Sequence, residues 1–386
     1  MNILIIRTIA IEEDCSKNLY NNQGIGLATE LSKMGHKCGL VYYAKKGNER
    51  SEIIHSDGTE IKVYHISGRN LVWNAIYDTI LYKICEKYDL IQVSECDQIC
   101  SWQVYRRFPD KTVIYHGPYK SQYTKKYNLR SKVFDMVFSW RSGFKNARVI
   151  TKSYLAEAYL KNKGFKNITT LGVGLNESVL NSPVEKLPKK LGHLIEKKDN
   201  FKYLLFIGTL SKRKNVMFLL QVLDNLINKN GHTNYKLVIV GDKEYKEEKY
   251  FHACFSYIRE KELSNNVVYL GTLEQKYLRF LYQACDLYLL ATQYDIFGMV
   301  YLEAMYFGIP ILTTECGGSS LLIRNGRTGY IQKNGDIKTW SRSAEKILEN
   351  DIKNQSISDN AKQLIQNKYL WSKLAPKFLE VYNEVI

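Results

Sequence analysis

The chain has 386 residues, of which 45% are hydrophobic and 24% are charged, and its formal net charge is +16. This length exceeds what one hydrophobic core usually supports, and the composition is that of a folded protein, so we expect two domains and exclude a disordered or fibrous chain. No apolar run approaches the roughly 18 residues that a membrane-spanning helix needs. The opening MNILIIRT reads as a first strand rather than a signal peptide, because Glu12, Glu13 and Asp14 soon follow. We therefore expect the protein in the cytoplasm.

The eight cysteines include no C-x-x-C pair, which fits small buried thiols in a reducing compartment. Cys96, Asp97 and Cys100 lie close together in the sequence, but no second cluster accompanies them, so a metal site there is not predicted. No two aspartates are separated by a single residue. The D-x-D metal clamp found in other transferases is therefore absent, and we expect neither a bound metal nor a requirement for a divalent cation.

Strand-like and helix-like segments alternate along the first half of the chain, which predicts an α/β fold with a parallel sheet. The strands are expected at residues 2–7, 38–43, 90–94, 112–116 and 147–152, and helices at 26–34 and 153–163. Gly24 and Gly26 belong to a glycine-rich turn near the first helix. This turn is not a dinucleotide fingerprint, because Thr29 stands where G-x-G-x-x-G needs its third glycine.

His116 falls at the carboxyl end of an expected strand, where α/β sheets bind ligands. It could equally be a turn residue that hydrogen-bonds the backbone before Gly117 and Pro118. The segment 182–200, with two prolines and many lysines, reads as a linker between domains.

Residues 118–152 carry half of the net charge, with nine basic residues against the single acid Asp135. Aromatic and aliphatic residues are interleaved with these bases. Such a segment can lie on an anionic bilayer, or it can be a solvated face whose aromatic residues belong to the core. Nucleic acid is a weaker alternative, because no recognised nucleic-acid module accompanies the charge.

In the second half, a strand at 203–207 is followed by the basic loop residues Lys212, Arg213 and Lys214 and by a helix from about Asn215. A second strand at 287–290 leads to a helix from about Gly298 that stops before Pro310. Asp295 precedes this helix and Glu303 lies within it. Amides at the helix start, those of Gly298, Met299 and Val300, would face an anion while the two carboxylates accept hydroxyl protons. A nucleotide-diphosphate sugar presents that combination of groups.

The residues Asp295, Phe297, Gly298, Glu303, Ala304, Met305, Gly308 and Pro310, followed by Gly317 and Gly318, resemble the signature of the retaining glycosyltransferases of family 4. The stretch Phe206 to Asn215 resembles the family's basic loop, with Thr209 where the family usually has Arg. The resemblance implies the GT-B fold, in which two Rossmann-like parallel-sheet domains face each other across a cleft. It implies an N-terminal acceptor-binding domain at 1–185, a nucleotide-sugar-binding domain at 186–370 and a last helix at 371–386 that packs back on the first domain.

The resemblance also implies roles for individual residues. Lys214, with Arg213 as substitute for the missing arginine, would bind the donor diphosphate. Asp295 would hold hydroxyls of the donor sugar and Glu303 the ribose, and His116 would reach the donor sugar. The nucleotide-binding set is completed by the glycine-rich turn and by the start of the signature helix: Gly24, Gly26, Gly298, Met299 and Val300.

The implied activity is transfer of a sugar, with retention, from a nucleotide-diphosphate sugar to a hydroxyl of a glycan, in synthesis of a bacterial surface polysaccharide. A UDP-sugar is the favoured donor, no other cofactor is expected, and the acceptor is expected to be lipid-linked at the inner face of the membrane. Asp295 departs from the family's usual Glu, which keeps two alternatives open. One is a non-catalytic GT-B subunit that binds sugar and stabilises a partner transferase, and the other is a phosphorylase or epimerase of the same fold.

Overall fold

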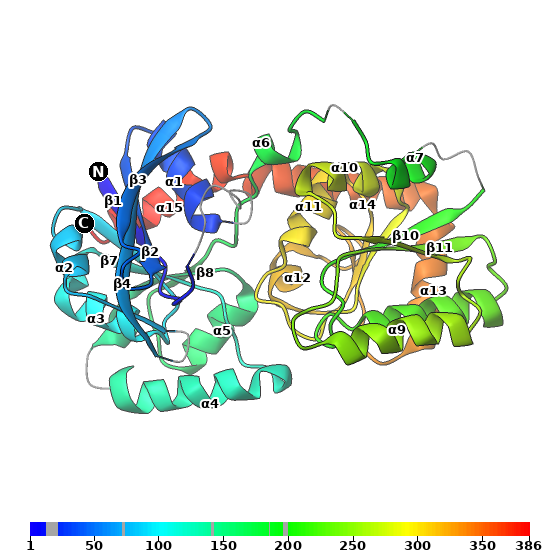
Figure 1. Ribbon diagram of the computed structural model, residues 1–386, viewed down its shortest axis with the longest axis horizontal. Helices are drawn as coiled ribbons and strands as arrows, with labels where there is room; N and C mark the ends of the chain where they lie inside the picture. The colour runs from blue at the N-terminus through cyan, green and yellow to red at the C-terminus, as the bar shows by residue number, and fades with distance from the viewer. Residues whose placement is uncertain (13–21, 72–73, 140–142, 185, 196–199) are drawn as a thin grey trace. The chain divides into compact units, whose positions relative to one another are not determined.

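The computed structural model describes residues 1–12, 22–71, 74–139, 143–184, 186–195 and 200–386, and the chain divides into two compact units (Figure 1). Unit 1 comprises Met1–Asn176 and Lys368–Ile386, and unit 2 comprises Glu177–Asn367. Glu13 and Asp14, and Trp140 and Arg141 of the basic segment, lie outside the described residues. Within the described ranges, no helix is both long enough and apolar enough to span a bilayer.

Unit 1 is built on one large, mostly parallel sheet. Its strands are β1 (Asn2–Ile6), β2 (Lys37–Ala44), β3 (Arg50–Ser56), β4 (Thr59–Leu71), β5 (Asn74–Tyr77), β6 (Leu90–Ser94), β7 (Thr112–His116), β8 (Arg148–Thr151) and β9 (Ile168–Thr170). Its helices are α1 (Gln23–Lys33), α2 (Ile80–Cys85), α3 (Ile99–Arg107), α4 (Lys125–Phe134), α5 (Tyr154–Asn162) and α15 (Trp371–Asn383). The strand order is β3-β4-β2-β1-β6-β7-β8-β9, with β5 paired to β4.

The strands expected at 90–94 and 112–116 are confirmed as β6 and β7, and the helix expected at 153–163 is α5. Ser153 caps the start of that helix, because its side-chain oxygen accepts a hydrogen bond from the Ala156 amide. The antiparallel pair β3–β4 was not predicted. Asp57 and Gly58 both have positive φ, which is typical of the two-residue turns that connect the strands of a hairpin.

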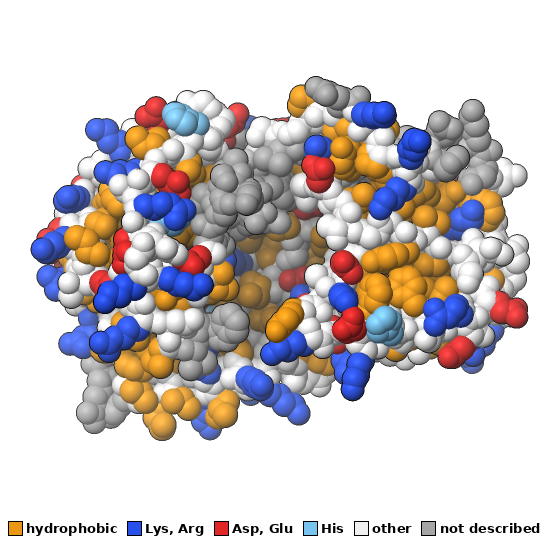
Figure 2. Space-filling model, in the orientation of Figure 1, with side chains coloured by type: hydrophobic (Ala, Val, Ile, Leu, Met, Phe, Trp, Pro, Cys, Tyr) orange, Lys and Arg blue, Asp and Glu red, His pale blue; other side chains and the backbone are white. Residues whose placement is uncertain are grey.

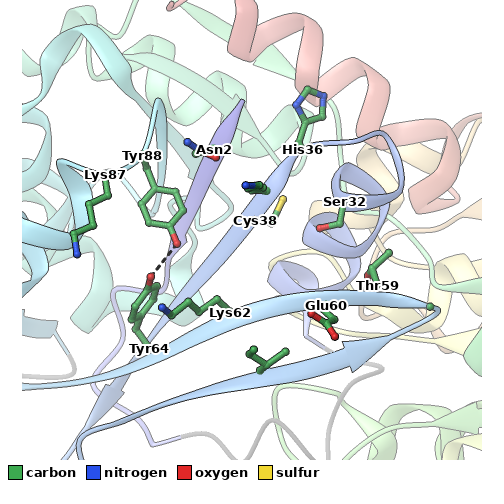
Figure 3. A pocket seen from close by; sticks show the side chains of 13 residues that line it. Asn2, Ser32, His36, Cys38, Thr59, Glu60, Lys62, Tyr64, Lys87 and Tyr88 are labelled. Carbon is green, nitrogen blue, oxygen red and sulfur yellow. Dashed lines mark hydrogen bonds between the residues drawn. The ribbon is translucent and has the colours of Figure 1, made fainter.

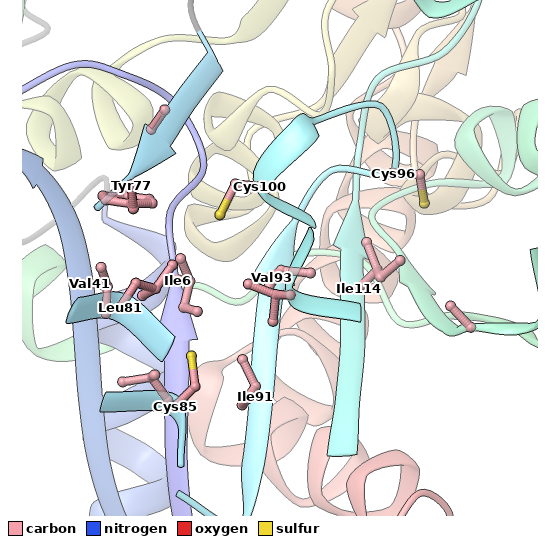
Figure 4. Packing of buried hydrophobic residues seen from close by; sticks show 14 of the residues in the cluster. Ile6, Val41, Tyr77, Leu81, Cys85, Ile91, Val93, Cys96, Cys100 and Ile114 are labelled. Carbon is pink, nitrogen blue, oxygen red and sulfur yellow. The ribbon is translucent and has the colours of Figure 1, made fainter. Parts of the chain in front are cut away.

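The core of unit 1 lies between the sheet and helices α2 to α5 (Figure 4). Side chains of alternate strand residues point to this face, among them Ile6, Ile91, Val93 and Ile114, as the two-residue period of a strand requires. The other face is covered by α1 and α15, and there Tyr382 donates a hydrogen bond of 2.6 Å to the side chain of Gln92. Both faces are therefore buried, which explains the continuous apolar runs of the central strands.

The last helix, α15, packs within unit 1 through a buried tryptophan. Trp371 is 4% exposed and its indole ring lies against two glycines, Gly26 of α1 and Gly174. A Cβ atom on Gly26 would lie 2.4 Å from Trp371 Nε1, and one on Gly174 would lie 2.2 Å from Trp371 Cδ2. Close packing accounts for glycine at both positions, because no larger residue fits beside the ring.

Gly26→Ala should destabilise the protein by about 1–3 kcal/mol, because the added methyl group overpacks the buried Trp371 ring. Gly24→Ala is the matched control in the same helix, since a Cβ there meets no atom closer than 3.3 Å and alanine favours the helix. Thermal and urea unfolding of both variants measures the difference. Equal midpoints for the two variants would contradict this account of Gly26.

Unit 2 is built on a smaller, wholly parallel sheet. Its strands are β10 (Lys202–Ile207), β11 (Tyr235–Val240), β12 (Val267–Gly271), β13 (Leu287–Leu290), β14 (Ile311–Thr313) and β15 (Tyr330–Ile331). Its helices are α6 (Glu177–Leu180), α7 (Lys189–Ile195), α8 (Val216–Asp224), α9 (Glu248–Glu260), α10 (Gln275–Ala284), α11 (Met299–Phe307), α12 (Gly317–Leu322), α13 (Ile337–Leu348) and α14 (Asp351–Lys368). The segment 182–200, predicted as a linker, contains the helix α7.

The strand order of unit 2 is β12-β11-β10-β13-β14-β15, so the order reverses between β10 and β13. Ligands of open α/β sheets bind outside the carboxyl ends of the strands at such a switch point. In unit 1 the corresponding reversal lies between β1 and β6. The predicted fold class, two Rossmann-like α/β domains with parallel sheets, is thus confirmed for each unit.

Candidate functional site

The loops that follow β10 and β13 are joined at the switch point of unit 2. The Gln293 amide donates to the Arg213 carbonyl at 2.8 Å, and the Thr292 hydroxyl donates to the same oxygen at 3.2 Å. Arg213 Nη1 donates in turn to the carbonyl of Tyr294 at 3.2 Å. Two segments about 80 residues apart in the sequence are therefore held together as one structure, which carries the predicted residues Arg213, Lys214 and Asp295.

Lys214 and Asp295 form an ion pair in this structure. Lys214 Nζ donates to Asp295 Oδ2 at 2.5 Å, and the two side chains are only 10% and 17% exposed. The ammonium is sheltered from water, so its attraction for an anion is stronger than that of a surface lysine. An incoming phosphate can replace the carboxylate as its partner.

The position of Asp295 is set by close backbone contacts with the start of α12. The amide of Gly317 donates to the carbonyl of Asp295 at 3.1 Å, and that of Gly318 donates to the carbonyl of Phe297 at 2.9 Å. A Cβ atom on Gly317 would lie 1.8 Å from the Ile296 carbonyl oxygen, so the loop needs glycine there. Gly298, with φ of 85°, then turns the chain into α11.

Glu303 lies in the second turn of α11 and is 2% exposed. Tyr282 of α10, also buried, donates its hydroxyl proton to Glu303 Oε2 at 2.8 Å. One carboxylate oxygen is therefore anchored and the rotamer of Glu303 is fixed. Tyr282 was not identified from the sequence, where it appears as one apolar position of an amphipathic helix.

Arg213 does not join the Lys214–Asp295 pair. Its second guanidinium nitrogen, Nη2, lies 3.9 Å from Glu244 Oε2, which also accepts a hydrogen bond of 3.2 Å from Thr209. Thr209, which stands where the family usually has Arg, and Arg213, its predicted substitute, thus share one acidic neighbour. Lys214 is the cation that the structure places directly beside Asp295.

In unit 1, His116 ends β7 as predicted, and its side chain is completely buried. The backbone amide of Cys96 lies 3.1 Å from His116 Nδ1, and the same nitrogen lies 3.1 Å from Glu95 Oε2. Glu95 follows β6 directly beside it and was not identified from the sequence. Its two oxygens accept hydrogen bonds from Lys152 Nζ at 2.9 Å and from the Gly117 amide at 2.8 Å.

Gly24 and Gly26 both lie inside the first turns of α1 rather than in a loop. Packing against Trp371 accounts for Gly26, and a role of these glycines in ligand binding stays a prediction. Two of the cavities lined by described residues lie at strand ends that bear on the predicted sites. One, of about 610 Å³, opens at the amino ends of β1 and β2 and contains none of the predicted residues (Figure 3). The other, of about 300 Å³, opens at the carboxyl ends of β10 and β11 beside Thr209.

Residues 193–364 match the family model of glycosyl transferases group 1. This segment lies within unit 2 and includes Lys214, Asp295 and Glu303. The domain-level resemblance predicted from the motifs is therefore confirmed, while membership of family 4 and a retaining mechanism stay predictions.

Several curated proteins are similar to the chain. N-acetyl-alpha-D-glucosaminyl L-malate synthase of Bacillus anthracis is 25% identical over 250 residues, which is 64% of this chain and 62% of that protein. The capsular polysaccharide biosynthesis glycosyltransferase CapM of Staphylococcus aureus is 26% identical over 215 residues, 54% of each chain. An uncharacterized glycosyltransferase of Methanocaldococcus jannaschii is 29% identical over 48% of this chain and 45% of its own. The chain thus spans between 45% and 62% of these relatives.

Two solved structures are similar over the whole chain. HepE from Anabaena, in complex with UDP, has a TM-score of 0.72 at 16% identity, and the match covers 100% of both chains. Sucrose-phosphate synthase from Thermosynechococcus elongatus has a TM-score of 0.74 at 16% identity, covering 100% of this chain and 99% of that one. At these identities the similarity establishes the fold, which is GT-B.

The buried ion pair between Glu95 and Lys152 should make the free energy of unfolding depend on pH in the acid range. Burial alone would raise the pKa of Glu95, but the Lys152 ammonium lowers it from 4.5 to about 2. Because the folded-state pKa is depressed, the stabilisation is present above the unfolded pKa and is lost as pH falls from about 4.5 to 2.

We expect wild type to exceed Glu95→Gln by about 3 kcal/mol in free energy of unfolding at neutral pH, and this gap to close with acidification. Urea unfolding at a series of pH values measures it, with the exposed Glu86→Gln as control. A gap that does not change with pH would show that the carboxylate charge of Glu95 does not stabilise the fold.

Proposed function

We propose that this protein is a glycosyltransferase that moves a sugar from a nucleotide-diphosphate sugar to a hydroxyl of a glycan, with retention of the anomeric configuration. The observation that carries the proposal is the sheltered Lys214–Asp295 pair at the switch point of unit 2. It lies ahead of α11, whose start presents backbone amides and whose second turn presents Glu303. The segment that contains these residues matches the glycosyl transferases group 1 model.

The chemistry follows from where charge develops. As the bond between the sugar and the diphosphate breaks, negative charge grows on the leaving phosphate and the sugar becomes oxocarbenium-like. Lys214, Arg213 and the amides of Gly298, Met299 and Val300 stabilise the leaving group in place of a divalent cation. Asp295, released from Lys214, accepts hydroxyls of the donor sugar, and Glu303 accepts those of the ribose. The leaving phosphate itself takes the proton of the attacking hydroxyl.

A UDP-sugar is the favoured donor. The similar HepE from Anabaena was crystallised with UDP and with UDP-glucose. The cavity of about 300 Å³ beside Thr209 lies at the carboxyl ends of β10 and β11, where a nucleoside joined to a Lys214-bound diphosphate would lie. CapM of Staphylococcus aureus and the similar lipopolysaccharide 1,2-N-acetylglucosaminetransferase of Salmonella typhimurium support a surface glycan as acceptor.

Lys214→Ala should reduce the rate of donor turnover by about 100-fold or more, the scale of loss when one preorganised charge partner of a transition state is removed. Turnover is measured as nucleoside diphosphate released from a panel of nucleotide sugars, with and without a glycan acceptor. Lys212→Ala is the matched control, because Lys212 lies in the same loop but is exposed. Wild-type turnover by a folded Lys214→Ala protein would refute the assignment of Lys214.

We further propose that unit 1 docks on an anionic membrane through the outer face of α4. This face consists of Leu129 and Val133 of α4 and of Met136 and Val137 in the π-helical turn Asp135–Ser139 that follows it. These four side chains are 46% to 68% exposed, and the exposed bases Lys125, Lys126 and Lys132 lie beside them. Figure 2 shows apolar and basic side chains together along the lower edge of unit 1, where Figure 1 places α4. An exposed apolar stripe flanked by lysines is complementary to lipid tails below anionic headgroups. Such docking places the protein at the inner face of the membrane, next to a lipid-linked acceptor.

The protein should pellet with vesicles that contain acidic phospholipid at low salt and dissociate as salt rises, because screening shortens the field to about 8 Å at physiological ionic strength. Replacing Lys125, Lys126 and Lys132 by glutamine should abolish pelleting, since each base contributes about 1 kcal/mol at such a surface. Arg130 is left unchanged because it faces Asp97.

The control for this experiment changes the net charge equally but at another place. It replaces the exposed Lys333, Lys338 and Lys353 of unit 2 by glutamine. If both triple variants lose binding alike, the interaction follows total charge and the outer face of α4 is not the docking surface. If wild type never pellets, membrane docking is refuted.

A further inference from the structure

The cavity of about 610 Å³ in unit 1 lies at the amino ends of β1 and β2 (Figure 3). Its size falls within the range of about 300–1,000 Å³ that is usual for cavities that hold small organic ligands. Ser32 of α1 and the start of β2 line one side, and the hairpin β3–β4 lines another. Ligands of open α/β sheets bind at the carboxyl ends of the strands, so a ligand here would occupy a different site.

A tyrosine pair borders this cavity, and a glycine makes room for it. Gly39 lies inside β2, where a Cβ atom would be 2.3 Å from the hydroxyl oxygen of Tyr88. Glycine inside a strand often marks such a close approach. The Tyr88 hydroxyl shares a hydrogen bond of 3.2 Å with the hydroxyl of Tyr64. Since one hydroxyl donates to the other, the second keeps a proton that it can donate to a ligand.

The lining of the cavity is basic. The described residues that form it include three lysines, Lys37, Lys62 and Lys87, and one acid, Glu60. The Glu60 carboxylate is 69% exposed and lies 4.0 Å from His55, which is itself a base. Figure 3 shows Lys62 and Lys87 on the same side of the cavity as the tyrosine pair.

This balance of charges favours a phosphate group as the anion. Lysine binds phosphate as a point charge, and a hydroxyl donor beside it adds a directed hydrogen bond. A phosphate monoester carries a charge of about −1.5 to −2 at neutral pH, which is close to the excess of lysines over acids in the lining. A carboxylate would neutralise only part of that excess.

The remaining lining fits an organic ring better than a bare phosphate ion. Ile53 of β3 lies in the cavity wall and is 58% exposed, although it is large and apolar. An apolar side chain and a tyrosine ring beside polar groups are typical of sites that bind a sugar or a base. His36 Nδ1 is buried and has no hydrogen-bond partner in the described part of the chain, and a polar group of a ring would satisfy it.

We propose that this cavity binds an organic phosphate monoester. Lys62, Lys87 and the free proton of the tyrosine pair hold the phosphate, and the ring lies against Ile53 with its polar groups toward His36. This site does not depend on the proposed function, because none of its residues belongs to unit 2. A sugar phosphate and a nucleotide share this chemistry, and the experiment separates them.

The test is isothermal titration calorimetry on the full chain in phosphate-free buffer at low salt, with glucose 6-phosphate, AMP and inorganic phosphate as probes. One variant combines Lys62→Gln with Lys87→Gln. Its matched control combines Lys46→Gln with Lys83→Gln, which changes the net charge equally at exposed positions of the same unit outside the cavity lining. Lys214→Ala shows whether a probe binds at the candidate donor site instead.

We expect wild type to bind at least one organic probe about 10-fold or more tightly than inorganic phosphate, which lacks the ring contacts. The Lys62→Gln, Lys87→Gln variant should bind that probe about 10-fold or more weakly, because it loses two charged partners of the phosphate. The control and Lys214→Ala should bind as wild type does. Whichever organic probe binds more tightly identifies the ring. Melting temperatures should not differ between wild type and the lysine variants, since the replaced side chains are exposed.

Four results would overturn the site. Absence of binding by wild type to both organic probes excludes it, and equal weakening in the two double variants shows that binding follows net charge alone. Loss of binding in Lys214→Ala places the probe in unit 2. Inorganic phosphate that binds as tightly as the organic probes shows an anion patch without a site for a ring.

Discussion

The pairing of β10 with β13 is the constraint on which the candidate donor site depends. These strands are neighbours in the sheet although residues 202–207 and 287–290 are far apart in the chain. Their carboxyl ends therefore bring the basic loop and the Asp295 loop into hydrogen-bond contact, and Lys214 meets Asp295 at 2.5 Å. Gly317 and Gly318 complete this arrangement, because only glycine lets α12 approach the loop backbone so closely.

The ion pair has a consequence for the shorter acid at position 295. An aspartate places its carboxylate nearer the backbone than a glutamate does, and in this structure Lys214 forms an ion pair with it. The charge of each group is thus neutralised by the other until a ligand arrives. In the proposed function, an anion that binds Lys214 takes the place of the Asp295 carboxylate, so the contacts of these two residues with a nucleotide sugar would be coupled.

Much of the fold could be predicted because the central strands are apolar and bounded by turn residues, as in 90–94, 112–116 and 287–290. The β3–β4 hairpin was missed even though Asp57 and Gly58 mark its turn, because its strands carry polar residues on one face. Lys214, Asp295 and Glu303 could be found from motif spacing. Tyr282 and Glu95 could not, because a hydrogen bond to a residue distant in the sequence leaves no local pattern.

The same limit applies with more force to Asp97. In the sequence Asp97 stands between two cysteines, which suggests at most a metal ligand. Its interactions depend on residues that are distant in the sequence. Only the structure shows that Asp97 is buried near Tyr127 and Arg130, while Glu95 pairs with Lys152. The basic segment that contains α4 could be recognised from the sequence, whereas the contact of its Arg130 with Asp97 could not.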